Sequence, residues 1–523
     1  MIRIAKTENG IVQGIPAADP RITAFKGIPY AAPPVGKLRW KAPQPAENWE
    51  GIRDCSRFGA IAMQETPGLD PEAFYSKEWH VDPEVLMSED CLNLNIWTPA
   101  KNENEKLPVM VWIFGGGLYN GYPSEMEFDG ERFARRGVVL VSINYRLNAF
   151  GFLAHPELTA EDPEYPTNFG HLDQRFALLW IKRNISAFGG DPENILLFGQ
   201  SAGGGSTFMQ VISPLNKGLF QKAIHHSSGG QLPPALDSFT LKEAEQMGVQ
   251  FFSDLGVSSL EEARELPAEK VVELGKLRKY NFGTVVGDKF MPDYPTSMIT
   301  DGKRNDIEIM TGNTGNEFQI RVQGDTLDEI KAFAERMFGD RAQEYMDIIT
   351  KGTEDVEQIK KNGQWNRFAI GNYIWLDTNI AQGKPNMYFY WFNPEIPGDD
   401  AGSFHSSDLW FAFETLAKCW RPFQGKHYDL ARQMCNYWTN FAKNGDPNGL
   451  DNDGTPMPEW KITHEGYVHP MYFGDTAFMD ERPRTELEEF LVDFYSKKLS
   501  KKERITFGRA VGRRADGSLI MNL

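Results

Sequence analysis

Cysteine is scarce in this sequence, which has four cysteines in 523 residues. They stand far apart and none belongs to a C-x-x-C pair, so we expect neither a disulfide framework nor a thiolate metal site. There is no H-E-x-x-H motif either. The one pair of neighbouring histidines, His225 and His226, lies in a predicted strand, where adjacent side chains point to opposite faces. We therefore expect no metal site. The cysteines are Cys55, Cys91, Cys419 and Cys435.

Positive charge is scarce as well. There are 55 lysines and arginines against 72 aspartates and glutamates, a formal net charge of −17. This balance argues against binding to nucleic acid or to an anionic membrane surface. No apolar run approaches the ~18 residues of a membrane span, and the first ten residues lack the apolar segment of a signal peptide. We expect a cytoplasmic protein, either a monomer or a small homo-oligomer.

Buried strands are the main structural signal that is present. Near-continuous Val, Ile, Leu and Phe runs separated by helical segments are typical of a parallel sheet covered on both faces. We predict an α/β fold in which residues 1–523 form one domain. A charged helical stretch around 321–380 is predicted to be an insertion or cap, and 64–88 a long irregular loop. The strand-like runs lie at 108–114, 138–143, 195–198, 307–310 and 387–392, and helical spacing appears at 172–188, 240–266 and 425–444.

The turn from Gly199 to Gly203 carries the strongest chemical signal. It has the pattern G-x-S-x-G and stands between a predicted strand and a predicted helix. That context is typical of a nucleophile elbow, which here would expose the hydroxyl of Ser201. Glycine is needed at both ends because the turn is too tight to hold a Cβ atom. The pattern also occurs in turns without chemistry, so the assignment depends on the rest of the chain.

A serine nucleophile needs a base, and the base needs an acid to orient it. In this kind of site the order along the chain is serine, acid, histidine, each in a loop after a strand. His405 lies in a polar loop after the strand at 387–392, and Glu317 in a loop after the strand at 307–310. The spacing predicts Glu317 and His405 as the partners of Ser201, while leaving open that either is an ordinary surface residue.

An oxyanion hole is predicted at the glycines that follow the strand at 108–114. Glycine lets backbone N–H groups approach a developing oxyanion closely, and the expected donors are Gly116, Gly117 and Ala202. A phosphate-binding loop is the alternative, but the segment has neither G-x-x-x-x-G-K-[ST] nor G-x-G-x-x-G spacing.

Several blocks of the sequence resemble the type-B carboxylesterases, an α/β-hydrolase family that includes cholinesterases and microbial carboxylesterases. The segment 188–203 resembles the active-site signature of that family, and Glu89–Trp97 resembles its second signature, with Asn93 in place of the usual Tyr, Thr or Phe. The similarity extends from about residue 3 to about residue 500. Further matching blocks lie at 25–31, 144–153 and 437–448.

The resemblance implies an α/β-hydrolase fold with a mostly parallel central sheet, helices on both faces and helical cap insertions. It implies the same catalytic triad and oxyanion hole as the residue patterns, without a cofactor. It also implies an ion pair between Glu89 and Arg146, and a supporting role for Ser227 beside the catalytic histidine.

Two departures from the family affect the function. The cysteine that pairs with the Cys91 position in secreted animal relatives is absent, since that stretch is Ala62-Met63-Gln64. Choline-hydrolysing relatives have glutamate before the nucleophile, whereas this chain has Gln200. The missing cysteine favours a cytoplasmic, microbial-type enzyme, and Gln200 argues against a cationic choline substrate.

The sequence thus predicts a serine carboxylic-ester hydrolase that acts on small to medium acyl esters. An esterase for feruloyl or other aromatic acyl groups, or a deacetylase of plant or drug esters, is the alternative. A non-catalytic, cholinesterase-like binding protein is a remote one. The aromatic side chains of 74–79 either line an aromatic pocket or serve as packing. The candidate substrate contacts are Phe114, Tyr119, Gln200 and Trp410.

Overall fold

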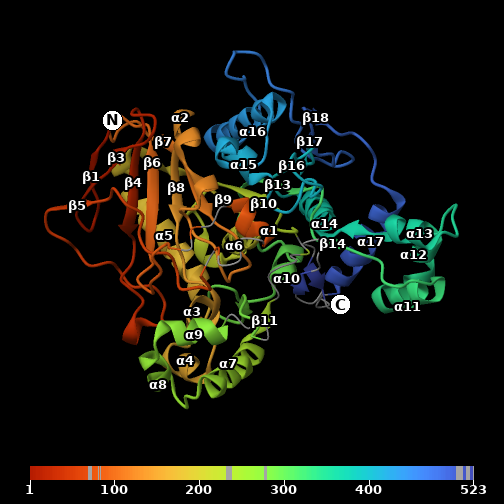
Figure 1. The fold of residues 1–523 in the computed structure, drawn as a ribbon, viewed down its shortest axis with the longest axis horizontal. Helices are drawn as coiled ribbons and strands as arrows, with labels where there is room; N and C mark the ends of the chain where they lie inside the picture. The colour runs from red at the N-terminus through yellow and green to blue at the C-terminus, as the bar shows by residue number, and fades with distance from the viewer. Residues whose placement is uncertain are drawn as a thin grey trace.

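The structure is a computed structural model (Figure 1). It describes residues 1–66, 68, 73–79, 82, 84–230, 232, 238–275 and 280–501, and the backbone of 510–513 and 519–521. The predicted loop at 64–88 therefore lies partly outside the described residues. Its described part contains a short helix, α1 (Phe74–Trp79), which the sequence analysis did not predict.

A twisted central sheet forms the core. In the described part of the chain it has eleven strands in the order β18-β17-β16-β13-β10-β9-β7-β8-β6-β4-β3. The strands from β17 to β8 run parallel, and antiparallel strands continue the sheet at both ends. The strands are β3 (Ile15–Pro16), β4 (Thr23–Pro29), β6 (Asn93–Thr98), β7 (Leu107–Ile113), β8 (Val139–Ile143), β9 (Gly190–Gln200), β10 (Lys222–His226), β13 (Glu308–Thr314), β16 (Met387–Phe392), β17 (Met471–Phe473) and β18 (Ala477–Met479).

All five apolar runs predicted as strands are strands of this sheet, and the prediction of an α/β fold is confirmed. The runs are almost continuously apolar because helices cover both faces of the sheet. His225 and His226 show this directly. The ring of His225 packs on Trp375 at 5.0 Å between centroids, and the ring of His226 packs on Trp438 at 5.4 Å. These tryptophans belong to α14 (Arg367–Ala381) and α16 (Gly425–Asn444), which therefore lie on opposite faces.

The helices predicted from spacing are also present. The helices not yet named, apart from those at 321–380, are α2 (Glu131–Arg135), α3 (Asn148–Phe152), α4 (Pro156–Glu161), α5 (Phe169–Asn184), α6 (Ala202–Ile212), α7 (Leu241–Leu255), α8 (Leu260–Glu265), α9 (Ala268–Gly275), α10 (Pro295–Thr300), α15 (Leu409–Ala412) and α17 (Glu486–Ser500). At the N-terminus, β1 (Ile4–Lys6) and β2 (Ile11–Gln13) pair antiparallel, and β5 (Ile52–Asp54) joins them.

The charged stretch at 321–380 contains two kinds of helix. α11 (Leu327–Phe338), α12 (Ala342–Ile349) and α13 (Val356–Gly363) pack on one another, and α12 packs on α17. Figure 1 shows these three at the end of the molecule opposite β1 and β5. α14, by contrast, is buried along most of its length and packs against β13.

Among the described helices, none has the length and apolar character that crossing a bilayer requires.

Candidate active site

The predicted nucleophile elbow joins β9 to α6. Ser201 stands between them with φ 56° and ψ −124°, a strained conformation for a residue other than glycine. The two glycines are required sterically. A Cβ atom on Gly199 would lie 2.4 Å from the carbonyl oxygen of Gly203, and one on Gly203 would lie 2.1 Å from that of Ile113. The tight turn predicted from G-x-S-x-G is therefore present.

The glycine loop after β7 lies directly beside this elbow, because β7 and β9 are neighbours in the sheet. A Cβ atom on Gly115 would lie 3.1 Å from the Cβ of Ser201. Gly116 and Gly117 have φ of 106° and 67°, in the region that favours glycine. Gly116 is exposed and Ala202, the first residue of α6, is buried. The three expected oxyanion donors thus belong to two segments that meet at Ser201.

Glu317 and His405 are in contact. The Nδ1 atom of His405 lies 2.5 Å from Oε2 of Glu317, and both side chains are buried. The other oxygen of Glu317 accepts the N–H of Thr314 at 2.9 Å. Their loops follow β13 and β16, which are adjacent parallel strands. The loops are joined by a hydrogen bond from the N–H of Asn316 to the carbonyl of Ser403, at 2.9 Å.

The opposite nitrogen of His405 faces the elbow. Its Nε2 atom lies 3.2 Å from the amide nitrogen of Gln200, the residue before Ser201. Within the part of the chain that the structure describes, the hydroxyl of Ser201 makes no hydrogen bond to His405. In enzymes without bound substrate such contacts are often long, and they tighten when the substrate binds.

Aromatic side chains surround the imidazole of His405. The ring of Phe318 lies 4.4 Å from it and the ring of Phe368 lies 5.4 Å from it, between centroids. On the backbone side, the hydroxyl of Tyr75 donates to the carbonyl of His405 at 3.2 Å, and Phe74 packs on Phe404. The side chains of α1 therefore contact the loop that carries His405. The aromatic residues of α1 stand out in the sequence, whereas no sequence pattern indicated Phe318 or Phe368.

A buried ion pair holds α1 in place, and no sequence pattern indicated it. Glu78 and Arg421 are 1% and 0% exposed and lie 2.9 Å apart. Glu78 also accepts the indole N–H groups of Trp410 and Trp420, at 3.2 and 3.1 Å. Arg421 reaches on to Asp399, at 2.7 Å, near the start of the His405 loop.

All four of the expected substrate contacts have little exposed surface, and Gln200 is 3% exposed. Phe114 is 0% exposed and stacks on Tyr145 at 4.5 Å between centroids. Trp410 is 1% exposed and packs on Trp79. Tyr119 is 6% exposed and donates its hydroxyl to the carbonyl of Tyr280. In this state Phe114 and Trp410 are packing residues, because a fully buried side chain presents no surface to a substrate.

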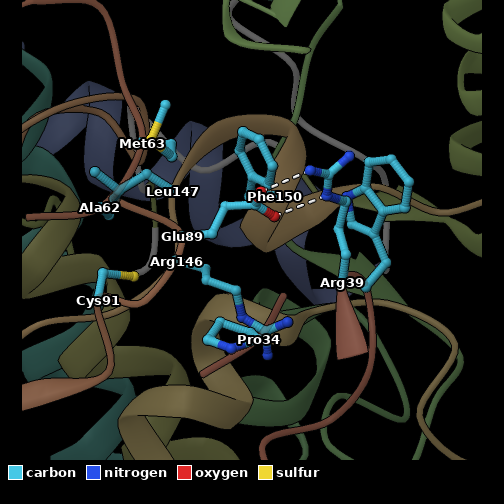
Figure 2. A pocket seen from close by; sticks show the side chains of 10 residues that line it. Pro34, Arg39, Ala62, Met63, Glu89, Cys91, Arg146, Leu147 and Phe150 are labelled. Carbon is cyan, nitrogen blue, oxygen red and sulfur yellow. Dashed lines mark hydrogen bonds and ion pairs between the residues drawn. The ribbon is translucent and has the colours of Figure 1, made fainter. Parts of the chain in front are cut away.

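The expected ion pair between Glu89 and Arg146 is wrong. Glu89 pairs with Arg39 at 2.6 Å, and Arg146 pairs with Asp173 at 2.7 Å. Figure 2 shows Glu89 bonded to Arg39, with Arg146 in the lining of the same pocket. The two were matched by sequence alone, and the fold supplies each with a nearer partner. This cavity has room for about one water, near 10 Å³.

Ser227 does not have the expected contact with the histidine. Its hydroxyl is buried and makes no hydrogen bond to any group that the structure describes. The neighbouring His226 has a clearer structural role, since its carbonyl accepts the N–H of Ser201 at 3.0 Å. The ring of His226 is fixed by Asp408 on Nδ1 and by Trp438 on Nε2, each at 2.8 Å.

All four cysteines are unbridged, and Cys91 is fully buried, which raises the pKa of its thiol. Across the residues described, no group of three or more His, Cys, Asp and Glu side chains is placed to hold a metal ion.

Comparison with known proteins identifies the family of this chain. Residues 2–486 match the carboxylesterase family. The chain belongs to the carboxylesterase family. It is 31% identical over 513 residues to the para-nitrobenzyl esterase of Bacillus subtilis, covering 94% of this chain and 98% of that protein. It is 30% identical to the fumonisin B1 esterase of Sphingopyxis macrogoltabida, covering 85% of this carboxylesterase and 82% of the relative.

Solved structures agree with this membership. A PNB esterase superposes with a TM-score of 0.74 at 29% identity, covering 94% of this chain and 100% of the other. A Geobacillus stearothermophilus carboxylesterase gives the same TM-score, identity and coverage. This carboxylesterase therefore has the α/β-hydrolase fold and is an ester-hydrolysing enzyme, as the sequence predicted.

Proposed function

We propose that this carboxylesterase cleaves small to medium acyl esters through a covalent acyl-enzyme, with Ser201 as nucleophile, His405 as general base and Glu317 as the acid that orients it. The observation that carries the proposal is the contact of Glu317 with Nδ1 of His405. A carboxylate there keeps the proton on Nδ1, so that Nε2 is left with the lone pair that a base needs.

The steps follow from this arrangement. Ser201 attacks the acyl carbonyl while His405 takes its proton at Nε2. The N–H groups of Gly116, Gly117 and Ala202 stabilise the oxyanion of the tetrahedral intermediate. His405 then gives the proton to the leaving alcohol, and the acyl group remains on Ser201. Water, activated by the same nitrogen, attacks the acyl-enzyme and releases the acid.

The preference for small to medium acyl groups is part of the proposal, and an aromatic acyl group is the alternative. The rings of Phe318 and Phe368 beside His405 favour the alternative to the extent that they contact substrate. We also propose a cytoplasmic location, which four unbridged cysteines support because reducing compartments keep thiols free. The net charge of −17 supports a role without nucleic acid.

The test is hydrolysis of p-nitrophenyl esters from acetate to palmitate, together with ferulate. We expect turnover by the parent enzyme and a loss of about 10⁴-fold or more in Ser201→Ala. Ser206→Ala is the matched control, because Ser206 is a buried serine on α6 whose hydroxyl has no hydrogen-bond partner among the described groups. It should keep parental activity. Equal activity in Ser201→Ala and the parent would overturn the proposed nucleophile.

The ester panel also decides between acyl classes. A rate that falls steadily beyond butyrate supports small to medium acyl groups, whereas a ferulate rate above all the alkyl esters supports the aromatic alternative.

A further inference from the structure

The contact between Gln200 and His405 defines the resting state of the base. A side-chain amide nitrogen only donates hydrogen bonds, so at 3.2 Å the Nε2 atom of His405 must be the acceptor. With Nδ1 bonded to the carboxylate of Glu317, the proton is on Nδ1 and the lone pair is on Nε2. Both partners of the imidazole thus specify one neutral tautomer.

We propose that Gln200 is a positioning residue that keeps the resting His405 neutral by occupying its Nε2 lone pair until substrate and Ser201 replace it. This inference rests on the proposed function, in which His405 is the base. Protonation of Nε2 would place its N–H against the N–H of Gln200, and two donors repel each other. A hydrogen bond made to the neutral form of a group disfavours its charged form.

The surroundings leave the amide little freedom. Gln200 is 3% exposed. A Cβ atom on Gly115 would lie 3.2 Å from Oε1 of Gln200, so the missing side chain of Gly115 makes room for the amide. The amide therefore lies between the oxyanion loop and the imidazole, with its oxygen beside the loop and its nitrogen toward His405.

Other charges near His405 do not substitute for this contact. Glu317 occupies Nδ1, and α1 contributes the hydroxyl of Tyr75, which bonds the backbone carbonyl rather than the ring. Asp408 is engaged by His226 and by the hydroxyl of Tyr390. The rings of Phe318 and Phe368 are uncharged. Arg421 lies over the ring of Phe404, one residue away. Of these groups, Gln200 is the one bonded to Nε2.

The chemistry of the position predicts the effect of changing it. A glutamate at 200 would accept the N–H of a protonated imidazole and would stabilise that form by opposite charge. As the pH is lowered, His405 would then become protonated, and unable to act as a base, at a higher pH than in the parent. The neutral amide adds no charge that would favour the protonated ring, and the enzyme must break one hydrogen bond when Ser201 approaches Nε2.

The experiment is the pH dependence of kcat/KM for p-nitrophenyl acetate in the parent, Gln200→Glu and Gln200→Met. We expect the acidic limb of the pH profile of Gln200→Glu to lie about one pH unit higher than that of the parent. On the acidic side of this limb, kcat/KM should then be roughly tenfold lower than in the parent, and at higher pH the loss should be much smaller. Gln200→Met keeps the volume without a donor or a charge, and its limb should move up by a smaller amount. A purely structural role would lower activity by the same factor at every pH.

The inference is overturned if Gln200→Glu is active with a limb at the parental pH or below it. If Gln200→Glu fails to fold, the decision falls to Gln200→Met, measured as the pH dependence of inactivation by diethyl p-nitrophenyl phosphate. A limb that coincides with the parental one would overturn the inference. Failure of the proposed function looks different, because Ser201→Ala would then retain activity whatever the Gln200 variants do.

Discussion

Arg421 and Glu78 form an ion pair that is almost completely shielded from water and joins α1 to the loop of His405. The guanidinium reaches Glu78 on one side and Asp399 on the other, and it lies 5.0 Å from the ring centroid of Phe404. The residue after Phe404 is His405. One buried side chain thus fixes both the aromatic helix and the loop that presents the proposed base.

Replacing Arg421 by methionine should destabilise the enzyme strongly. The change leaves Glu78 buried without its cation, and breaking one side of a buried pair costs about 3–5 kcal/mol. The measurement is the free energy of unfolding in urea, with kcat/KM measured alongside. The surface pair of Lys351 and Glu486 provides the control, since both side chains are well exposed. Lys351→Met should change stability by less than about 0.5 kcal/mol. Equal effects of the two substitutions would contradict the structural role of Arg421.

The sequence predicted those features that depend on local pattern. The apolar runs gave the strands, and G-x-S-x-G together with the glycines at 115–117 placed the elbow and its neighbouring loop, because backbone sterics make glycine necessary there. Loops after adjacent strands also brought Glu317 and His405 together. Side-chain contacts between distant residues that no motif or strand order links could not be predicted. Glu78 and Arg421 are 343 residues apart, and Gln200 and His405 are 205 apart.

The predicted ion pair was wrong because it was inferred from the sequence without side-chain positions. Glu89 is partly buried and Arg146 is buried, and the two have opposite charges, yet each has another partner. Which ion pairs form depends on side-chain positions to within about an ångström, and a sequence pattern does not contain that information. The same limit applies to Phe114 and Trp410, whose burial follows from packing with residues far along the chain.

Glu317→Gln tests the proposed acid. The amide no longer fixes the proton on Nδ1 of His405, so a large part of the enzyme holds the wrong tautomer, and kcat should fall by about 10³–10⁴-fold. Stability should change little, because Oε1 of glutamine can still accept the N–H of Thr314. The measurement is kcat for p-nitrophenyl acetate. Asp400→Asn, at an exposed acid of the His405 loop, is the control and should stay within about twofold. A glutamine variant with a tenth of parental kcat would rule Glu317 out.

Gly203→Ala tests the steric argument for the elbow. The new methyl group would lie 2.1 and 2.6 Å from the carbonyl oxygens of Ile113 and Phe114, which are backbone atoms in the centre of the sheet. We expect a loss of about 3 kcal/mol or more in unfolding free energy, together with loss of activity.

The control for this change is Gly425→Ala, at the start of α16, where a Cβ atom meets nothing within 4 Å. Alanine there should be neutral or stabilising by up to about 1 kcal/mol, because it favours the helix and restricts the unfolded chain. Thermal unfolding of both variants separates the two cases, and a stable, active Gly203→Ala would refute the steric argument.

Asp288 should make stability depend on pH in a defined direction. Burial raises the pKa of its carboxyl from the ordinary 3.8 to about 6, against hydrogen bonds from Met291 and Asn168 that lower it. The folded state therefore holds a proton that the unfolded chain has already lost, and stability falls as the pH rises from about 4 to about 6.

Asp288→Asn removes this titration. Relative to the parent, its unfolding free energy should improve by about 1 kcal/mol between pH 5 and pH 8, on top of a constant offset from altered hydrogen bonding. Urea unfolding at the two pH values measures this difference. Asp400→Asn is the control, and the difference between its unfolding free energy and that of the parent should be the same at both pH values. A difference that stays constant or reverses for Asp288→Asn would mean that its carboxyl is ionised in the folded enzyme at pH 5.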